Sequence, residues 1–303
     1  MMRHFLDDDD LSRSELLTLI ERSVELKSEL RQGKRPDILK NRVLGMIFSK
    51  ASTRTRTSFE AGMAQMGGHA INLTPNDTQL GRGEPLTDTA KVLSEMVDAV
   101  MIRNDSQTDQ IAFADNASVP VINGLSDLLH PCQMLADVQT IIELRGAIDG
   151  AKVAWIGDGC NMCNSWIKIA AKMGCELTIA CPEGYDPNAK ILTTAQELAP
   201  GKIQIVRNPE DAAKNADVVM TDVWASMGQE SEAQARMKAF NGYCVDDRLM
   251  KGAHPDAIFL HCLPAHRGEE VSASVIDGEQ SVVWQQAGNR LHAQKALLEL
   301  LLT

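Results

Sequence analysis

Residues 43–66 read VLGMIFSKASTRTRTSFEAGMAQM, and this stretch indicates the fold. The apolar run Val43–Phe48 is typical of a buried strand, and the apolar residues Phe59 and Met63 then recur at the spacing of one helix face. The polar motif Ser52–Arg56 stands between the two patterns. A strand followed by a helix is the repeating unit of an α/β sheet. The motif therefore falls where the strand has ended and the helix begins.

The Ser52–Arg56 motif, Ser-Thr-Arg-Thr-Arg, predicts an anion site. The first turn of a helix presents unsatisfied backbone N–H groups and the positive end of the helix dipole. The two arginines of the motif add guanidinium groups that bind phosphate with paired hydrogen bonds. Phosphate or a phosphate ester is therefore the expected occupant.

The same alternation of strand and helix continues along the whole chain. The predicted strands are 43–48, 70–73, 99–103, 119–123, 152–156, 177–181, 217–221 and 257–261. The predicted helices are 11–31, the one that follows the arginine motif, 88–96, 134–144 and 164–173. Alternating strands and helices predict parallel sheets, so the fold class is α/β with two doubly wound domains, each a mainly parallel sheet flanked by helices.

The expected domains are residues 1–133 and 134–287, with a C-terminal helix at about 288–303 that packs back onto the first domain. In parallel sheets, ligands bind at the carboxyl ends of the strands. Several polar residues follow predicted strands directly, among them Arg103, Asp222 and Cys262. We therefore expect an active site in the interdomain cleft.

Composition and charge limit the function classes. The chain has 303 residues and a net charge of -11, whereas nucleic-acid binding requires a basic surface, so neither nucleic acid nor an anionic membrane is an expected partner. The N-terminus, in which four aspartates follow Leu6, lacks the apolar region of a signal peptide. We expect a cytoplasmic protein.

The seven cysteines predict reduced thiols, because an odd number is scattered along a long chain. Cys160 and Cys163 form a single C-x-x-C, and a zinc site requires a second pair or histidines at ligand spacing. We therefore expect two small residues on a buried helix. The neighbouring Gly157-Asp158-Gly159 resembles the opening of a dinucleotide fingerprint, but Met162 stands where the third glycine belongs, which favours a turn role.

Two further motifs carry a resemblance. They are His130-Pro131-Cys132-Gln133 and His261-Cys262-Leu263-Pro264. Together with Ser52–Arg56, and in this order and spacing, they resemble the aspartate/ornithine carbamoyltransferase family. The segment 222–228, DVWASMG, is similar to the ornithine-binding loop of the ornithine-specific members, and 77–84, DTQLGRGE, is similar to a loop of the whole family. The resemblance extends from the helix that begins near Leu11 to residues 289–294.

The resemblance implies a reaction and an assembly. Members of this kind transfer the carbamoyl group of carbamoyl phosphate to the δ-amine of L-ornithine, giving L-citrulline and phosphate in arginine metabolism. It implies no cofactor and no metal. It also implies a homotrimer with shared active sites, in which Gln79 reaches the site of a neighbouring subunit.

The resemblance also implies site residues. Those for carbamoyl phosphate are Ser52, Thr53, Arg54, Thr55, Gln79, Arg103, His130, Gln133, Cys262, Leu263 and Arg290. Those for ornithine are Asn161, Asp222, Ser226 and Met227. Arg103, His130, Asp222 and Cys262 are the expected catalytic residues, the first two at the carbamoyl oxygen and the other two at the δ-amine. Three neighbours differ from the family pattern: Ser49 and Gly288 stand where glutamate is usual, and Cys160 where asparagine is.

Other functions remain open from the sequence. An aspartate-specific enzyme would carry His-Pro-Leu-Pro-Arg in place of His261–Pro264, and basic residues in place of Ser226–Gly228. Acetylornithine, succinylornithine or putrescine are alternative acceptors. A non-catalytic relative that binds anions or a partner enzyme is a third possibility, which the complete set of site residues disfavours.

Overall fold

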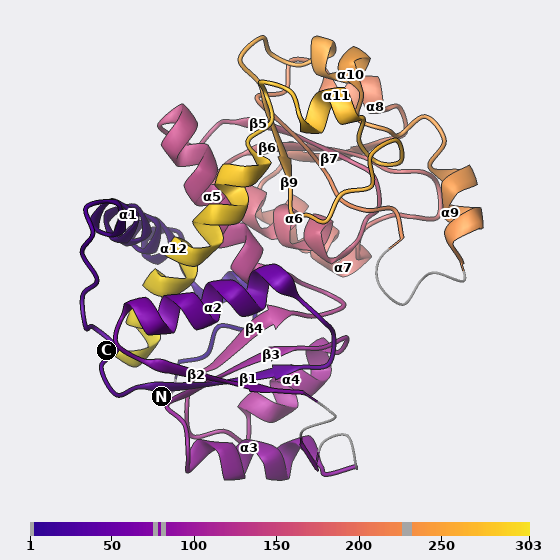
Figure 1. The fold of residues 1–303 in the computed structure, drawn as a ribbon. Helices are drawn as coiled ribbons and strands as arrows, with labels where there is room; N and C mark the ends of the chain where they lie inside the picture. Colours follow the sequence, from indigo (N-terminus) through magenta and orange to yellow (C-terminus); the bar gives the residue numbers. More distant parts are fainter. Residues whose placement is uncertain (1–2, 75–77, 80–82, 226–231) are drawn as a thin grey trace. The chain divides into compact units, whose positions relative to one another are not determined.

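The computed structural model describes residues 3–74, 78–79, 83–225 and 232–303 (Figure 1). The chain divides into two compact units, the first formed by Met1–Gln139 with Gly288–Thr303 and the second by Thr140–Ala287. The sequence placed the boundary a few residues earlier, at 133/134. Helix α5 (Pro131–Arg145) is continuous across both positions, so no break in the chain marks the division. Each unit is described by itself below.

The first unit contains a sheet of four parallel strands. Its strands are β1 (Val43–Phe48), β2 (His69–Leu73), β3 (Ala99–Arg103) and β4 (Val121–Leu125). Their order is β2-β1-β3-β4. The chain thus moves outward from β1 to β2 and then returns to the other side of β1. This reversal creates a switch point between β1 and β3, where open parallel sheets bind ligands.

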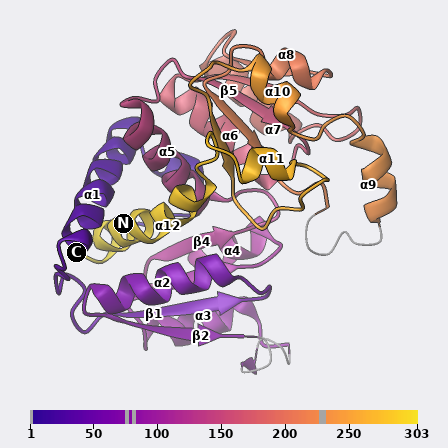
Figure 2. The same cartoon turned by 45° about the horizontal axis from the view of Figure 1, so that its top comes forward.

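Helices cover both faces of this sheet (Figure 1). They are α1 (Arg13–Arg31), α2 (Thr53–Gln65), α3 (Leu86–Ser94), α4 (Gln107–Ala114) and the C-terminal α12 (Val283–Leu302), after the short η1 (Asp8–Asp10). On one face, Ala90 of α3 and Phe113 of α4 pack against strand residues such as Ile102. On the other face lies α2, which packs against α12 so closely that a side chain at Gly62 would contact Lys295 (Figure 2).

The second unit contains five parallel strands in the order β7-β6-β5-β8-β9. They are β5 (Lys152–Ile156), β6 (Glu176–Ala180), β7 (Ile203–Val206), β8 (Val218–Thr221) and β9 (Ile258–His261). The helices are α6 (Asn161–Met173), α7 (Ala189–Leu198), α8 (Pro209–Ala213), α9 (Ala233–Ala239), α10 (Asp247–Gly252) and α11 (Ala273–Ile276). The chain reverses direction between β5 and β8, so this sheet has its own switch point.

The α/β class and the parallel sheets are confirmed, and most predicted strands lie within a residue or two of their observed bounds. The fourth strand is shifted, because Pro120 has no N–H to contribute to the ladder and the strand begins at Val121. Sequence reasoning missed β7, an edge strand in which Gln204 interrupts the apolar residues and only Ile203 is buried. It also missed α4, α7 and the short helices α8 to α11. Among the described residues, no helix is long and apolar enough to cross a bilayer.

Candidate functional site

In the first unit, the site begins with the N-terminus of α2. The Ser52 hydroxyl accepts a hydrogen bond from the backbone N–H of Thr55 at 3.2 Å, which caps the helix. The helix therefore begins at Thr53, in the middle of the arginine motif, and its first turn carries the N–H groups that favour an anion. Arg54 lies in this first turn and is half-buried.

Thr55 receives two guanidinium groups from distant parts of the unit. Its side chain is 1% exposed. Arg290 Nη2, from α12, donates to Thr55 Oγ1 at 2.9 Å, and Arg103 Nη1, from the last residue of β3, donates to the same oxygen at 3.4 Å. One strand end and two helices thus meet at one hydroxyl.

His130 and Gln133 complete this cluster from the start of α5. Arg290 Nη1 donates to Gln133 Oε1 and lies 3.4 Å from His130 Nε2. The Gln133 amide nitrogen donates to Asp137 Oδ1 at 2.8 Å, one helical turn further on. This bond orients the amide, so that its oxygen faces Arg290.

The electrostatics of the cluster favour an anion. Burial and the nearby charges of Arg290, Arg103 and Arg54 hold the pKa of His130 well below its usual value. The imidazole is therefore neutral at neutral pH. The positive charge of the cluster resides on the three guanidinium groups, and a doubly charged phosphate ester would compensate it.

Gln79 is not brought to this cluster by any contact among the described residues. Its side chain is exposed, and its backbone carbonyl accepts from the Glu84 N–H at 3.1 Å. The expected role of Gln79 in a neighbouring subunit stays a prediction.

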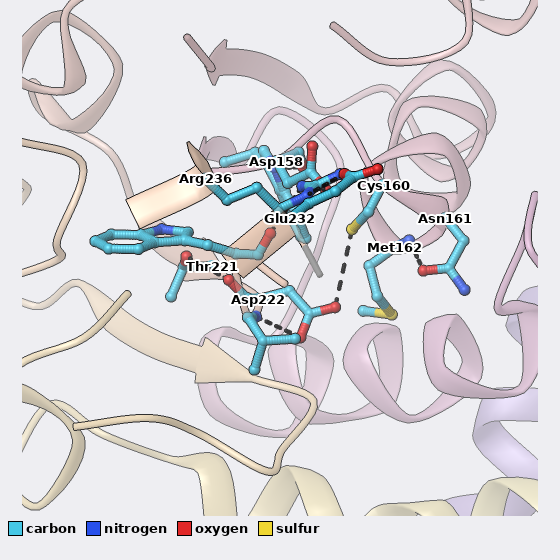
Figure 3. A network of polar contacts seen from close by, with 11 residues as sticks. Asp158, Cys160, Asn161, Met162, Thr221, Asp222, Glu232 and Arg236 are labelled. Atoms are coloured by element: carbon cyan, nitrogen blue, oxygen red, sulfur yellow. Dashed lines mark hydrogen bonds and ion pairs between the residues drawn. The ribbon is translucent and has the colours of Figure 1, made fainter. Parts of the chain in front are cut away.

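In the second unit, Asp222 and Cys262 lie directly after the neighbouring strands β8 and β9. Cys262 Sγ donates to Asp222 Oδ1 at 3.2 Å, and the Val223 N–H donates to the same oxygen at 2.8 Å. Cys160 Sγ lies 3.8 Å from the other oxygen, Oδ2 (Figure 3). Burial and the Asp222 charge raise the pKa of Cys160 well above its usual value, so it remains a thiol and donates. Asp222, which is 7% exposed, thus accepts hydrogen bonds from two thiols.

Asn161, the first residue of α6, follows the loop after β5. Its Oδ1 accepts from the Met162 N–H at 2.9 Å, which orients the side-chain amide (Figure 3). The two other residues expected to bind ornithine, Ser226 and Met227, lie outside the described residues.

A buried histidine fixes the backbone next to Cys262. His261 Nδ1 accepts from the Leu263 N–H at 2.8 Å, and His261 Nε2 lies 3.1 Å from Glu270 Oε1. These partners place the imidazole proton on Nε2. Leu263 has φ of 61°, in the left-handed region, a conformation that costs on the order of 1–3 kcal/mol for a residue other than glycine. The bond to His261 helps to hold it.

Two groups of side chains have the donor types of a metal site. In the part of the chain that the structure describes, Asp222, His261 and Cys262 have donor atoms within 4.8 Å of one another, as do His266, Glu269 and Glu270. Both nitrogens of His261 already have partners within the chain. A metal at the first group would therefore require His261 to give up one of these bonds.

The glycines after β5 have a structural role. A side chain at Gly159 would lie 2.2 Å from the backbone nitrogen of Pro187. The Gly159 N–H also donates to the Tyr185 carbonyl at 2.9 Å. Gly159 therefore allows two segments of the chain to approach closely, as the turn interpretation of this motif predicts.

Some residues around the two clusters were not anticipated from the sequence. Asp137 was recognisable, because it stands four positions after Gln133 on a helix. His261 belongs to a motif that was recognised, but without a role for the histidine. Glu270 carries no sequence signal, since only the folded chain brings it to His261.

Comparisons with known proteins match both parts of the chain to one family. Residues 3–143 match the family model "Aspartate/ornithine carbamoyltransferase, carbamoyl-P binding domain", and residues 149–301 match "Aspartate/ornithine carbamoyltransferase, Asp/Orn binding domain". The chain is 58% identical over 301 residues to an ornithine carbamoyltransferase of Halorhodospira halophila, covering 99% of each chain. It is 57% identical to an anabolic ornithine carbamoyltransferase of Pseudomonas aeruginosa, covering 99% of this chain and 97% of the relative.

Solved structures agree in fold. The structure of an ornithine carbamoyltransferase from Pyrococcus furiosus has a TM-score of 0.95 at 49% identity and covers 99% of this chain and 97% of that one. The corresponding structure from Burkholderia thailandensis has a TM-score of 0.92, also at 49% identity, and covers 99% of each.

Proposed function

The chain belongs to the aspartate/ornithine carbamoyltransferase family, and on that premise we propose that it transfers the carbamoyl group of carbamoyl phosphate to the δ-amine of L-ornithine. The products are L-citrulline and phosphate. The observation that carries the proposal is the convergence of Arg103 and Arg290 on Thr55, at the N-terminus of α2. This cluster fits a phosphate ester, and its neutral His130 fits a carbonyl oxygen.

The first unit holds the carbamoyl donor in this proposal. Ser52, Thr53, Arg54 and Thr55 bind the phosphate through backbone N–H groups, hydroxyls and the Arg54 guanidinium. Arg103 and His130 donate to the carbamoyl oxygen, with Thr55 beside them. These donors stabilise the negative charge that the oxygen acquires when the carbonyl carbon is attacked. Gln133 and Arg290 lie against the same group.

The second unit holds the acceptor. Asn161 and Asp222 bind the polar groups of ornithine, together with Ser226 and Met227. The δ-amine is mostly protonated at neutral pH and must lose a proton before it attacks. Asp222, with Cys262 beside it, orients the amine and accepts hydrogen bonds from it.

The bonding changes are then simple. A C–N bond forms between the amine and the carbamoyl carbon, and the C–O bond to phosphate breaks. The protonated amine loses two protons in all: one goes to solvent before the attack, and the second goes to the departing phosphate as the C–N bond forms. Cys262 and Leu263 contact the carbamoyl group without forming a covalent bond to it.

We include in the proposal a homotrimer in the cytoplasm that serves arginine biosynthesis. The exposed side chain of Gln79 supports a shared site, since an exposed residue can reach a neighbouring subunit. The anabolic name of the Pseudomonas aeruginosa relative supports the biosynthetic role.

Initial rates of carbamoyl transfer test the proposal. Carbamoyl phosphate is supplied with ornithine, acetylornithine, putrescine or aspartate, and phosphate release and ureido product are measured together. A strong preference for ornithine is expected. Turnover with one of the other amines but not with ornithine would overturn the assignment of ornithine as acceptor. No turnover with any of them would favour the non-catalytic alternative.

A further inference from the structure

Arg236, on α9 of the second unit, makes a set of buried contacts that the mechanism above does not use. The residue is 8% exposed. Its Nη1 donates to Asp158 Oδ2 at 2.9 Å and to the Trp224 carbonyl at 2.8 Å (Figure 3). Its Nε lies 3.3 Å from Glu232 Oε2. One guanidinium thus joins three segments of the chain.

These contacts lie at the switch point of the sheet. Asp158 belongs to the loop after β5, and Trp224 belongs to the turn after β8 that begins with Asp222. The two strands are neighbours, and their carboxyl ends carry the proposed ornithine residues Asn161 and Asp222. Arg236 therefore holds together the two loops from which the acceptor residues project.

The position of the guanidinium is itself fixed from several sides. It lies over the Tyr185 ring, 5.1 Å from the ring centre, an attractive arrangement for a cation. Phe240, at the end of α9, stacks on Trp224 with the ring centres 5.5 Å apart, and it contacts Tyr185 edge-on at 4.8 Å. The Trp155 indole N–H donates to the Asp158 carbonyl at 2.9 Å. Both partners of Arg236 are thus held by packed aromatic rings.

Charge gives Arg236 a second effect. Asp158 is buried near Asp222, and burial, with a smaller contribution from the Asp222 charge, raises the pKa of Asp158, while Arg236 opposes this rise. Without the guanidinium, Asp158 would be a buried acid beside the carboxylate that is to bind the amine. The cation keeps Asp158 paired.

We propose that Arg236 is a positioning residue for the acceptor: by joining Asp158 to the Trp224 carbonyl, it sets the orientation of Asp222 and thereby the affinity for ornithine. The inference rests on the proposed function, because it concerns the amine side of that same reaction. It predicts an effect on ornithine alone, since Arg236 and the contacts given above lie in the second unit, whereas Arg54, Arg103 and His130 belong to the first.

The test measures steady-state constants for both substrates in four variants. Arg236→Gln is expected to raise the KM for ornithine at least tenfold and to leave the KM for carbamoyl phosphate within about twofold of wild type. Arg236→Lys retains the charge but not the planar fork of donors. Its KM for ornithine should lie between the values of wild type and Arg236→Gln. Asp158→Asn retains the bond from Arg236 to Trp224 and should raise the ornithine KM only several-fold. Arg248→Gln is the matched control, because Arg248 also pairs with an acid in this unit, Glu210, but is 65% exposed.

The outcomes separate positioning from simple stabilisation. A residue that only stabilised the fold would lower the apparent kcat through loss of folded protein and leave the ornithine KM unchanged. An unchanged ornithine KM in Arg236→Gln, or an equal rise in both KM values, would overturn the inference. If Arg236→Gln does not fold, Asp158→Asn provides the test. An unchanged ornithine KM in that variant, or an equal rise in both KM values, would overturn the inference. Wild-type protein that fails to turn over ornithine would instead refute the proposed function.

Discussion

Arg290 donates to the hydroxyl of Thr55 at 2.9 Å, although 235 positions separate the two residues in the sequence. The bond connects α12 to the first turn of α2. The same guanidinium also contacts Gln133 and His130 from α5. The C-terminal helix therefore supplies the side chain that links the other elements of the donor cluster.

Arg290→Gln is expected to weaken carbamoyl phosphate binding at least a hundredfold. It removes a positive charge from the anion site, takes the Arg290 donor from the buried Gln133 oxygen and leaves Thr55 with the longer bond from Arg103, which costs about 1–3 kcal/mol of stability. Titration calorimetry with carbamoyl phosphate and denaturant unfolding measure the two effects. Arg42→Gln is the control, because Arg42 pairs with Asp98 in the same unit but is 48% exposed. Equal affinities in the two variants would contradict the assigned role of Arg290.

Arg54→Ala should abolish measurable binding of carbamoyl phosphate, because the site loses its expected phosphate partner at the N-terminus of α2. Arg56→Ala provides a close comparison, since Arg56 lies two residues away on the same helix and pairs with Glu60 at 2.9 Å. That variant should bind normally. If both variants bound normally, the phosphate would have to lie elsewhere.

Cys262→Ala should lower turnover about ten- to a hundredfold and leave carbamoyl phosphate binding largely intact. The variant removes the thiol that donates to Asp222 but none of the guanidinium groups of the donor cluster. Steady-state kinetics and calorimetry separate the two effects. Cys244→Ala, at another half-buried thiol of the same unit, should be close to wild type. A complete loss of carbamoyl phosphate binding would contradict this prediction, because it would make the thiol essential for holding the donor.

His130 should make the folded protein sensitive to acid. Its pKa in the folded chain is far below 6.5, so between these two values the unfolded chain binds the additional proton. The free energy of unfolding should therefore fall as the pH drops below about 6.5, by up to about 1.4 kcal/mol per pH unit from this group.

Denaturant unfolding of wild type and His130→Gln between pH 5 and 8 measures this contribution. The difference in stability between the two should vary below pH 6.5 and be constant above pH 7. A constant difference across the whole range would mean that His130 does not contribute to the pH dependence.

Mixed oligomers test the shared site. Gln79→Ala and Arg54→Ala variants should each be nearly inactive alone. If Gln79 acts in the site of a neighbouring subunit, mixing the two variants after mild dissociation should restore part of the activity, because some sites then receive both intact side chains. The specific activity of the mixture and its mass by light scattering provide the measurement. Activity no greater than the mean of the separate variants would argue against a shared site.

The sequence by itself determined the α/β class, the strand ends and the residues that follow them. Runs such as Val43–Phe48 and Val153–Ile156 are apolar along their length, as buried parallel strands must be. The motifs that follow these strands are contiguous in the sequence. Their residue types alone therefore predicted binding sites for an anion and an amine. The strand β7 was missed because Gln204 interrupts its apolar residues and the strand is only partly buried at the edge of the sheet.

Only the tertiary structure decided which of these residues meet. The strand order places the ends of β1 and β3 together in one sheet and the ends of β5 and β8 together in the other, and sequence spacing does not encode that order. The contacts of Arg290 with Thr55 and of Arg236 with Asp158 join segments far apart in the chain. Such contacts depend on how helices pack onto a sheet, and packing is a property of the folded chain and not of any local pattern.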